Sequence, residues 1–149
     1  MVVPRRDGVD KIPSGVGGWL LLLCLLLLVG QPINLAIGAA RALGSLQMRG
    51  LPLALTMMGQ LMVAGIGVGA GLALLGRRRG AATFAKGSLL LSAGTDLFVY
   101  STPFVPNNRL PGTTPIFVIA SLTYYAIWIA YLSLSKRVRN TFQAADSGI

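Results

Sequence analysis

The chain has 149 residues, of which 54% are hydrophobic and only 11% are charged, and its formal net charge is +9. Charged residues make up roughly a quarter of a soluble domain, so this composition and a mean hydropathy of +0.69 indicate an integral membrane protein. The basic residues stand in short clusters beside apolar segments, which is typical of membrane topology signals and argues against a nucleic-acid-binding surface.

The chemistry available to the chain is limited, because histidine is absent and Cys24 is the only cysteine. Metal sites, haem ligation and nucleophile–base pairs draw on these residue types, so we expect no metal, no cofactor and no catalytic activity. A membrane enzyme would need two convergent titratable groups in its spans. The sequence offers only Asp96, with tyrosines as weak partners. Cys24 lies among leucines and is interpreted as a small packing residue.

Four apolar segments follow one another along the chain, at about residues 16–40, 51–76, 87–104 and 116–135. Helices of this length cross a hydrocarbon core of roughly 30 Å. The sequence therefore predicts an all-α integral membrane protein with a single domain, in which four transmembrane helices form a compact bundle. The first segment has an alternative interpretation as a cleaved signal peptide, since a basic start and an apolar core precede small residues at positions 38–40.

The first two segments carry features of helix packing. Pro32 should bend the first segment, and the neighbouring Gln31 and Asn34 supply polar groups for freed carbonyls or another helix. The second segment contains the polar Gln60 and two overlapping small-xxx-small pairs. Glycines so spaced allow a neighbouring backbone to approach closely. The four glycines are Gly65, Gly67, Gly69 and Gly71, paired as 65 with 69 and 67 with 71.

The third segment contains Asp96, the only acidic residue in any apolar segment. An ionised carboxylate at the centre of a bilayer costs roughly 2.5–3.5 kcal/mol on insertion scales, so it must be shielded, neutralised or used. Other polar residues of this segment stand before and after Asp96 at spacings of three or four residues. They share one side of the helix, which should face protein. These residues are Ser88, Ser92, Thr95 and Tyr100.

The fourth segment repeats this one-sided pattern with Ser121, Tyr124, Tyr125, Trp128, Tyr131 and Ser135. Trp128 and Tyr131 also fit an interfacial aromatic belt, whereas Tyr124 and Tyr125 lie too deep for one. Counted from Gly87, Asp96 lies about 13–14 Å deep, level with Tyr125 and Gly67. The predicted spans contain no Lys, Arg or His. We therefore expect a neutral Asp96 with a mainly structural role, hydrogen-bonded to Tyr125, Tyr124 or a carbonyl near the glycines.

The basic residues also predict the orientation in the membrane. Ten of them fall in the N-terminal segment, the second loop and the C-terminal segment, namely Arg5, Arg6, Lys11, Arg77, Arg78, Arg79, Lys86, Lys136, Arg137 and Arg139. The opposite side has only Arg41, Arg49 and Arg109. Because cytoplasmic loops carry the excess of Lys and Arg, both termini are expected in the cytoplasm.

Two stretches of sequence together resemble a known family. Gly15-Val-Gly-Gly-Trp-Leu20 opens the first span, and Trp128-Ile-Ala-Tyr-Leu-Ser-Leu-Ser-Lys-Arg-Val-Arg-Asn-Thr-Phe142 closes the last. They are similar to the start and the ending of the bacterial inner-membrane family catalogued as domain of unknown function 2569, although Ala130 stands where the family pattern has proline. The resemblance implies four spans in a bacterial cytoplasmic membrane, and it brings no catalytic residue.

We therefore predict a non-catalytic accessory or assembly subunit of a larger membrane complex, whose partners are lipid and other membrane subunits. The alternative is proton or small-solute translocation centred on Asp96. The glycine-rich second span, its arginine-bearing turn and the acid in the third span also resemble the proteolipid ring subunit of rotary ATPases. Two further spans would obstruct a tight ring of that kind.

Overall fold

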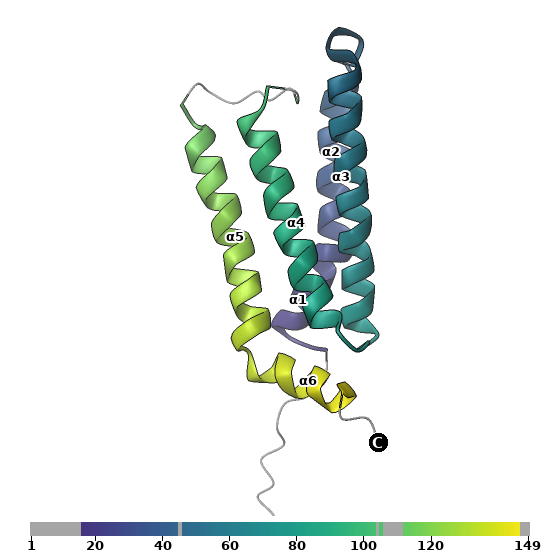
Figure 1. Ribbon diagram of the computed structural model, residues 1–149, viewed down its shortest axis with the longest axis vertical. Coiled ribbons are helices and arrows are strands. Elements are labelled where there is room, and N and C mark those ends of the chain that lie inside the picture. The colour runs from purple at the N-terminus through teal and green to yellow at the C-terminus, as the bar shows by residue number, and fades with distance from the viewer. Residues whose placement is uncertain (1–15, 45, 104, 106–111, 147–149) are drawn as a thin grey trace, which may run out of the picture.

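The structure is a computed structural model of the chain, and it describes residues 16–44, 46–103, 105 and 112–146. Every regular element within these ranges is a helix. The elements are α1 (Trp19–Leu25), the π-helix η1 (Leu26–Gly30), α2 (Gln31–Leu43), α3 (Leu46–Leu75), α4 (Ala81–Ser101), α5 (Thr114–Leu134) and α6 (Lys136–Asp146). The long helices run side by side along the molecule, and the short α6 lies across one end (Figure 1). We call this end the α6 end.

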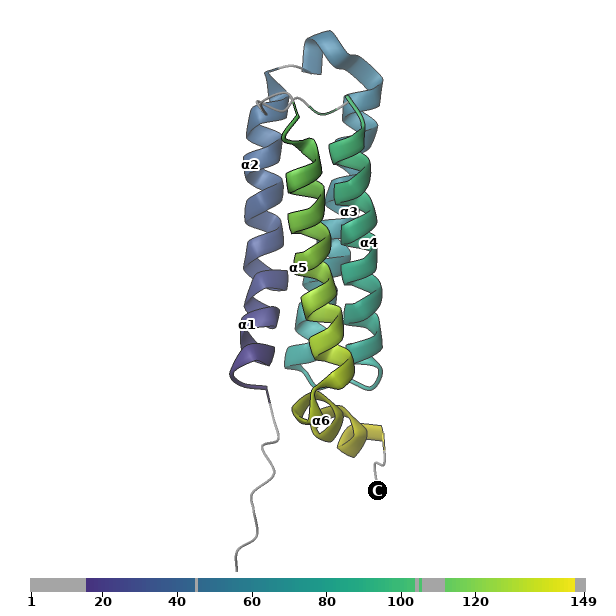
Figure 2. The same cartoon turned by 90° about the vertical axis from the view of Figure 1, so that its left-hand side faces the viewer.

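The elements α1, η1 and α2 follow one another directly and form one rod (Figure 2), here called the first helix (Trp19–Leu43). The π-turn of η1 comes just before Pro32. Proline has no N–H and its ring clashes with the carbonyl four residues earlier, here that of Leu28. The wider turn relieves this clash, and the N–H of Gln31 bonds back to the carbonyl of Leu26. The adaptation to Pro32 is therefore a local widening of the helix.

Glycines with positive φ mark changes of direction within α3 and before α4. Gly50, with a φ of 53°, interrupts α3 near its start, so the apolar helix proper spans Gly50–Leu75. Gly80, with a φ of 72°, precedes α4 and closes a short turn after α3. Both angles lie in the left-handed region, which glycine adopts without the steric cost of a Cβ.

The helices pack in the order of the sequence: the first helix on α3, α3 on α4, and α4 on α5. The long helices alternate in direction, as Figures 1 and 2 show. The buried core is concentrated toward the α6 end, where residues from nearly every element meet. It includes Leu20, Leu23 and Leu27 of the first helix, Leu74 of α3, Leu89 of α4, Trp128 and Leu132 of α5, and Val138 and Phe142 of α6.

Three helices in the described part of the chain are long and apolar enough to cross a membrane: Trp19–Leu43, Gly50–Leu75 and Thr114–Leu134. The prediction of an all-helical protein with such segments is confirmed to that extent. With 21 residues, α4 matches α5 in length. It is less apolar because it contains Lys86, Asp96 and several hydroxyl residues, and it is not among the three.

The two largest differences from the sequence-based prediction concern the start of α4 and the segment after α5. α4 begins at Ala81 and not at residue 87, so Lys86 belongs to the helix. The sequence analysis assigned no helix after residue 135, yet α6 follows there and buries Val138 and Phe142. Ser135 marks its start, since its Oγ accepts a hydrogen bond from the N–H of Val138 at 3.5 Å. This is the usual role of serine before the first turn of a helix.

Candidate functional site

Asp96 lies on α4 and is hydrogen-bonded to two hydroxyl groups of α5. The hydroxyls of Ser121 and Tyr125 both donate to Asp96 Oδ2, each at 2.9 Å. Ser121 and Tyr125 are four residues apart, so they project from the same face of α5. The carboxyl group thus joins α4 to α5 at a single point, which we call the Asp96 cluster.

Tyr125, and not Tyr124, is the aromatic partner of Asp96. The sequence allows either tyrosine in this role. The Tyr124 ring packs instead edge-on against Tyr125, with centroids 5.1 Å apart, and against Trp128 at 6.3 Å. It is 40% exposed. Ser121 was not among the candidate site residues, although its position one turn before Tyr125 was the available signal.

The position of Asp96 along α4 differs from the estimate based on the sequence. That estimate counted from residue 87, whereas α4 begins at Ala81. Fifteen residues at 1.5 Å each place Asp96 roughly 22 Å along the helix, in its second half. The level predicted for Tyr125 is right relative to Asp96, as their hydrogen bond shows. Gly67, which the sequence places at the same level, contacts a different polar residue.

That residue is Gln31, the second of the polar candidates that the structure places between helices. Its Nε2 donates to the Ser92 hydroxyl at 3.0 Å and so connects α2 to α4. The side-chain amide lies directly over Gly67 of α3, where a Cβ would overlap it. Gln31 Oε1 and the hydroxyl of Ser88 are both buried without a hydrogen-bond partner among the described residues. Gln31 therefore touches three helices at once.

Of the four glycines of α3, two lie close against the first helix and two do not. Gly67 faces Gln31, and at Gly71 a Cβ would come within 2.9 Å of Leu28 Cγ and 3.2 Å of Leu27 Cβ. These two glycines allow the first helix to approach α3 closely. A Cβ at Gly69 would make an ordinary contact with Phe84 at 3.7 Å, and one at Gly65 would meet no atom within 4 Å.

The remaining polar candidates stay apart from the Asp96 cluster. Asn34 is exposed on α2, and Gln60 lines a groove between α3 and α4 that is described below. Cys24 is fully buried and unpaired. Within the described ranges there is no group of three residues that could together hold a metal ion.

A second set of contacts joins the two stretches of sequence that carry the family resemblance. The Arg137 guanidinium lies over the backbone of Gly17 and Gly18, since Cβ atoms there would be 3.1 Å from Nη2 and 3.3 Å from Nη1. Trp19 packs against Trp128, with ring centroids 6.2 Å apart. The Gly-Gly-Trp start and the segment that follows Trp128 therefore close the α6 end together.

No family model, curated protein or solved structure matches this chain. The contacts described above therefore carry the functional argument. They include two polar links between helices, those of Asp96 and Gln31, and one close helix contact at Gly67 and Gly71.

Proposed function

We propose that the chain is a four-span protein of the bacterial cytoplasmic membrane with both termini in the cytoplasm. The position of α4 supports a fourth span, because α4 packs between α3 and α5, which are both apolar enough to cross a membrane (Figure 1). Its Ser92 and Asp96 are hydrogen-bonded to other helices. Such bonds lower the cost of placing polar groups in a bilayer.

The resemblance to the family catalogued as domain of unknown function 2569 belongs to the same proposal. It rests on two short stretches of sequence, and the contacts of Arg137 with Gly17 and of Trp19 with Trp128 give both stretches one shared structural task. The two stretches therefore act together at one place in the structure.

The topology predicts the result of a reporter fusion. A reporter that is active only in the cytoplasm is expected to be active after Ile149, because ten of the thirteen Lys and Arg residues mark that side. The same reporter inserted after Gly112, on the opposite side, serves as the control and should be inactive. Activity of a periplasm-dependent reporter after Ile149 would contradict the orientation. A mature N-terminus at Arg41 would show that the first span is cleaved.

We propose that this protein acts without catalysis, as an accessory or assembly subunit of a larger membrane complex. The observation that carries the proposal is the Asp96 cluster, in which the single acidic side chain of the spans is held by two hydroxyls of the neighbouring helix. Gln31 is likewise used to join helices. Polar side chains that form hydrogen bonds between helices of the same chain support a role in helix packing. The turn between α3 and α4 is short, so partners are expected within the membrane.

Purification tests the accessory role. The tagged full chain, extracted from native membranes in mild detergent, is expected to migrate with a larger complex whose other subunits are identified by mass spectrometry. Untagged membranes processed in parallel give the background. Recovery without any other protein, together with no heterologous cross-link in intact membranes, would contradict the accessory role.

Proton or small-solute translocation is the second candidate, and one observation favours it. Ser88, Ser92 and Asp96 follow one another at four-residue intervals on α4, and Ser88 Oγ and Gln31 Oε1 are buried without partners in the described structure. Water molecules bound to these atoms would extend a polar file toward Asp96.

A further inference from the structure

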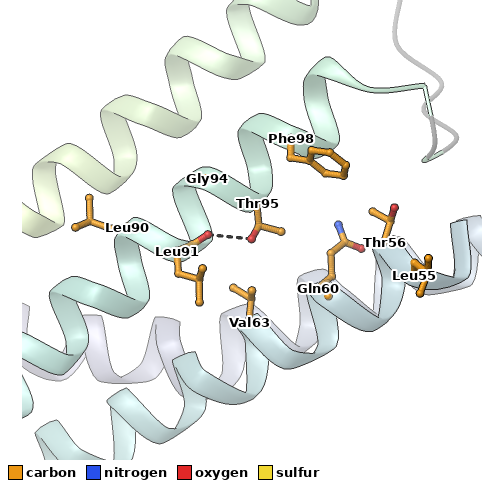
Figure 3. A pocket seen from close by; sticks show the side chains of 10 residues that line it. Leu55, Thr56, Gln60, Val63, Leu90, Leu91, Gly94, Thr95 and Phe98 are labelled. Atoms are coloured by element: carbon orange, nitrogen blue, oxygen red, sulfur yellow. Dashed lines mark hydrogen bonds between the residues drawn. The ribbon is translucent and has the colours of Figure 1, made fainter. Parts of the chain in front are cut away.

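An open groove runs between α3 and α4 on the outer surface of the molecule (Figure 3). It has a volume of about 480 Å³ and is walled mainly by apolar side chains such as Leu55, Val63 and Phe98. Gly59 of α3 and Gly94 of α4 also line it, and a Cβ at either glycine would meet no atom within 4 Å. Two of the positions that line the groove, one on each helix, therefore carry no side chain and leave room in it. We call it the α3/α4 groove.

The α3/α4 groove contains one polar side chain that is not satisfied within the described part of the chain. The hydroxyls of Thr56 and Thr95 donate to carbonyls of their own helices, Pro52 at 2.8 Å and Leu91 at 2.9 Å. Figure 3 draws the second of these bonds. The amide of Gln60, which extends into the groove, has no such partner. An amide left unpaired in hydrocarbon is costly, which points to an occupant with hydrogen-bonding groups.

The depth of Gln60 decides what kind of occupant is suitable. The apolar helix starts at Gly50, so Gln60 lies ten residues in, roughly 15 Å at 1.5 Å per residue and near the middle of a core about 30 Å thick. Acyl chains carry no hydrogen-bond donor or acceptor at this depth. A transmembrane helix with a polar side chain supplies a hydrogen-bonding group at this depth. Glycines at the interface are the usual feature that allows two such helices to approach each other closely.

We propose that a second copy of this chain occupies the groove, and that two copies pair about a two-fold axis along the membrane normal with Gln60 facing Gln60. This inference rests on the four-span topology proposed above. Copies inserted in the same orientation present each residue at the same depth, so the partner supplies an amide where one is needed. An amide is both donor and acceptor and is complementary to itself, as a two-fold interface requires.

Disulfide cross-linking in native membranes tests the pairing with Gln60 intact. Thr56→Cys and Val63→Cys place a thiol in the groove about one turn on either side of Gln60. Each is expected to form a covalent dimer of twice the 15.6 kDa chain mass on mild oxidation. Met62→Cys is the matched control, since it lies at nearly the same depth but outside the groove lining and is 66% exposed. The native chain controls for Cys24, which is buried.

Two further substitutions in the Val63→Cys background test the roles of the amide and of the glycines. Gln60→Leu should weaken association by about three- to twenty-fold, the range of interhelical hydrogen bonds in membranes. Gly59→Leu should abolish the cross-link by filling the groove, whereas Gly65→Leu, on the same helix but away from the groove lining, should leave it unchanged.

Three results would overturn the proposal: cross-linking of Val63→Cys only to a different protein, a monomer with lipid retained in the groove, or equal dimer formation by Met62→Cys and Val63→Cys. The result is distinguishable from that of the accessory role. A cross-linked dimer that purifies without other proteins would leave the pairing standing and remove the accessory role, and capture of other subunits with no dimer would do the reverse.

Discussion

Gly71→Leu is expected to separate α3 from the first helix and to leave little folded protein. Even a single carbon at this position would come within 3.2 Å of Leu27 Cβ. Leu27 is in the buried core, and its Cβ is fixed to the backbone and cannot rotate away. The two helices must therefore move apart. Overpacking typically costs about 1–3 kcal/mol and occasionally more, measurable as a loss of monodisperse protein on heating in detergent.

Gly65→Leu is the matched control for this experiment. It makes the same chemical change six residues earlier on the same helix, where a Cβ meets no atom within 4 Å. Because leucine is a better helix former than glycine by up to about 1 kcal/mol, this variant should be at least as stable as the native chain. Equal stability of the two variants would show that the first helix does not pack on Gly71.

Asp96→Leu is expected to lower stability and abundance, while Asp96→Asn preserves both. Leucine removes the acceptor of two hydrogen bonds. Ser121 can turn its hydroxyl to a carbonyl of its own helix, whereas the Tyr125 hydroxyl is left unpaired. The loss should amount to about 1–2 kcal/mol. Asparagine keeps an acceptor oxygen of similar position. Thermal unfolding in detergent and protein level in membranes are the measurements.

The same pair of variants separates the two functional proposals. If Asp96 is structural, Asp96→Asn also keeps the physiological effect of the protein, and Tyr125→Phe shows a partial loss of stability that matches its one lost bond. If Asp96→Asn is abundant and correctly assembled but physiologically inactive, the function requires the carboxyl group itself. The translocation function would then replace the structural one.

The polar faces of α4 and α5 could be predicted because each follows from the residue spacing within one helix. Asp96 and Tyr125 each belong to a polar face with a period of three to four residues, so two such faces on consecutive helices were expected to meet, and they do. The contact of Gln31 with Ser92 and Gly67 was not predicted. It depends on the rotation and register of three helices relative to one another, and no local pattern fixes these.

The misplaced boundaries have a similar physical origin. The charge of Lys86 indicates a loop in the sequence, yet a long lysine side chain within a helix can extend its ammonium group to the membrane surface. The helix α6 is not predicted because its segment opens with Lys136, Arg137 and Arg139, which are typical of a topology signal. Ser135 and the four-residue spacing of Val138 and Phe142 are nevertheless a short amphipathic signal. A search for long apolar segments does not detect a short polar helix such as α6.

The closure of the α6 end also sets an order of events during synthesis. The first helix enters the membrane early, but Trp19 and Gly17 find their partners only when Trp128 and Arg137 have left the ribosome. The α3 and α4 hairpin needs only neighbours in sequence and can form well before that. Contacts between such distant positions form late because a long loop must be closed first. Until then, Leu20 and Leu23 lack the residues of α5 and α6 that complete their buried cluster, so the α6 end is the last part of the molecule to be covered.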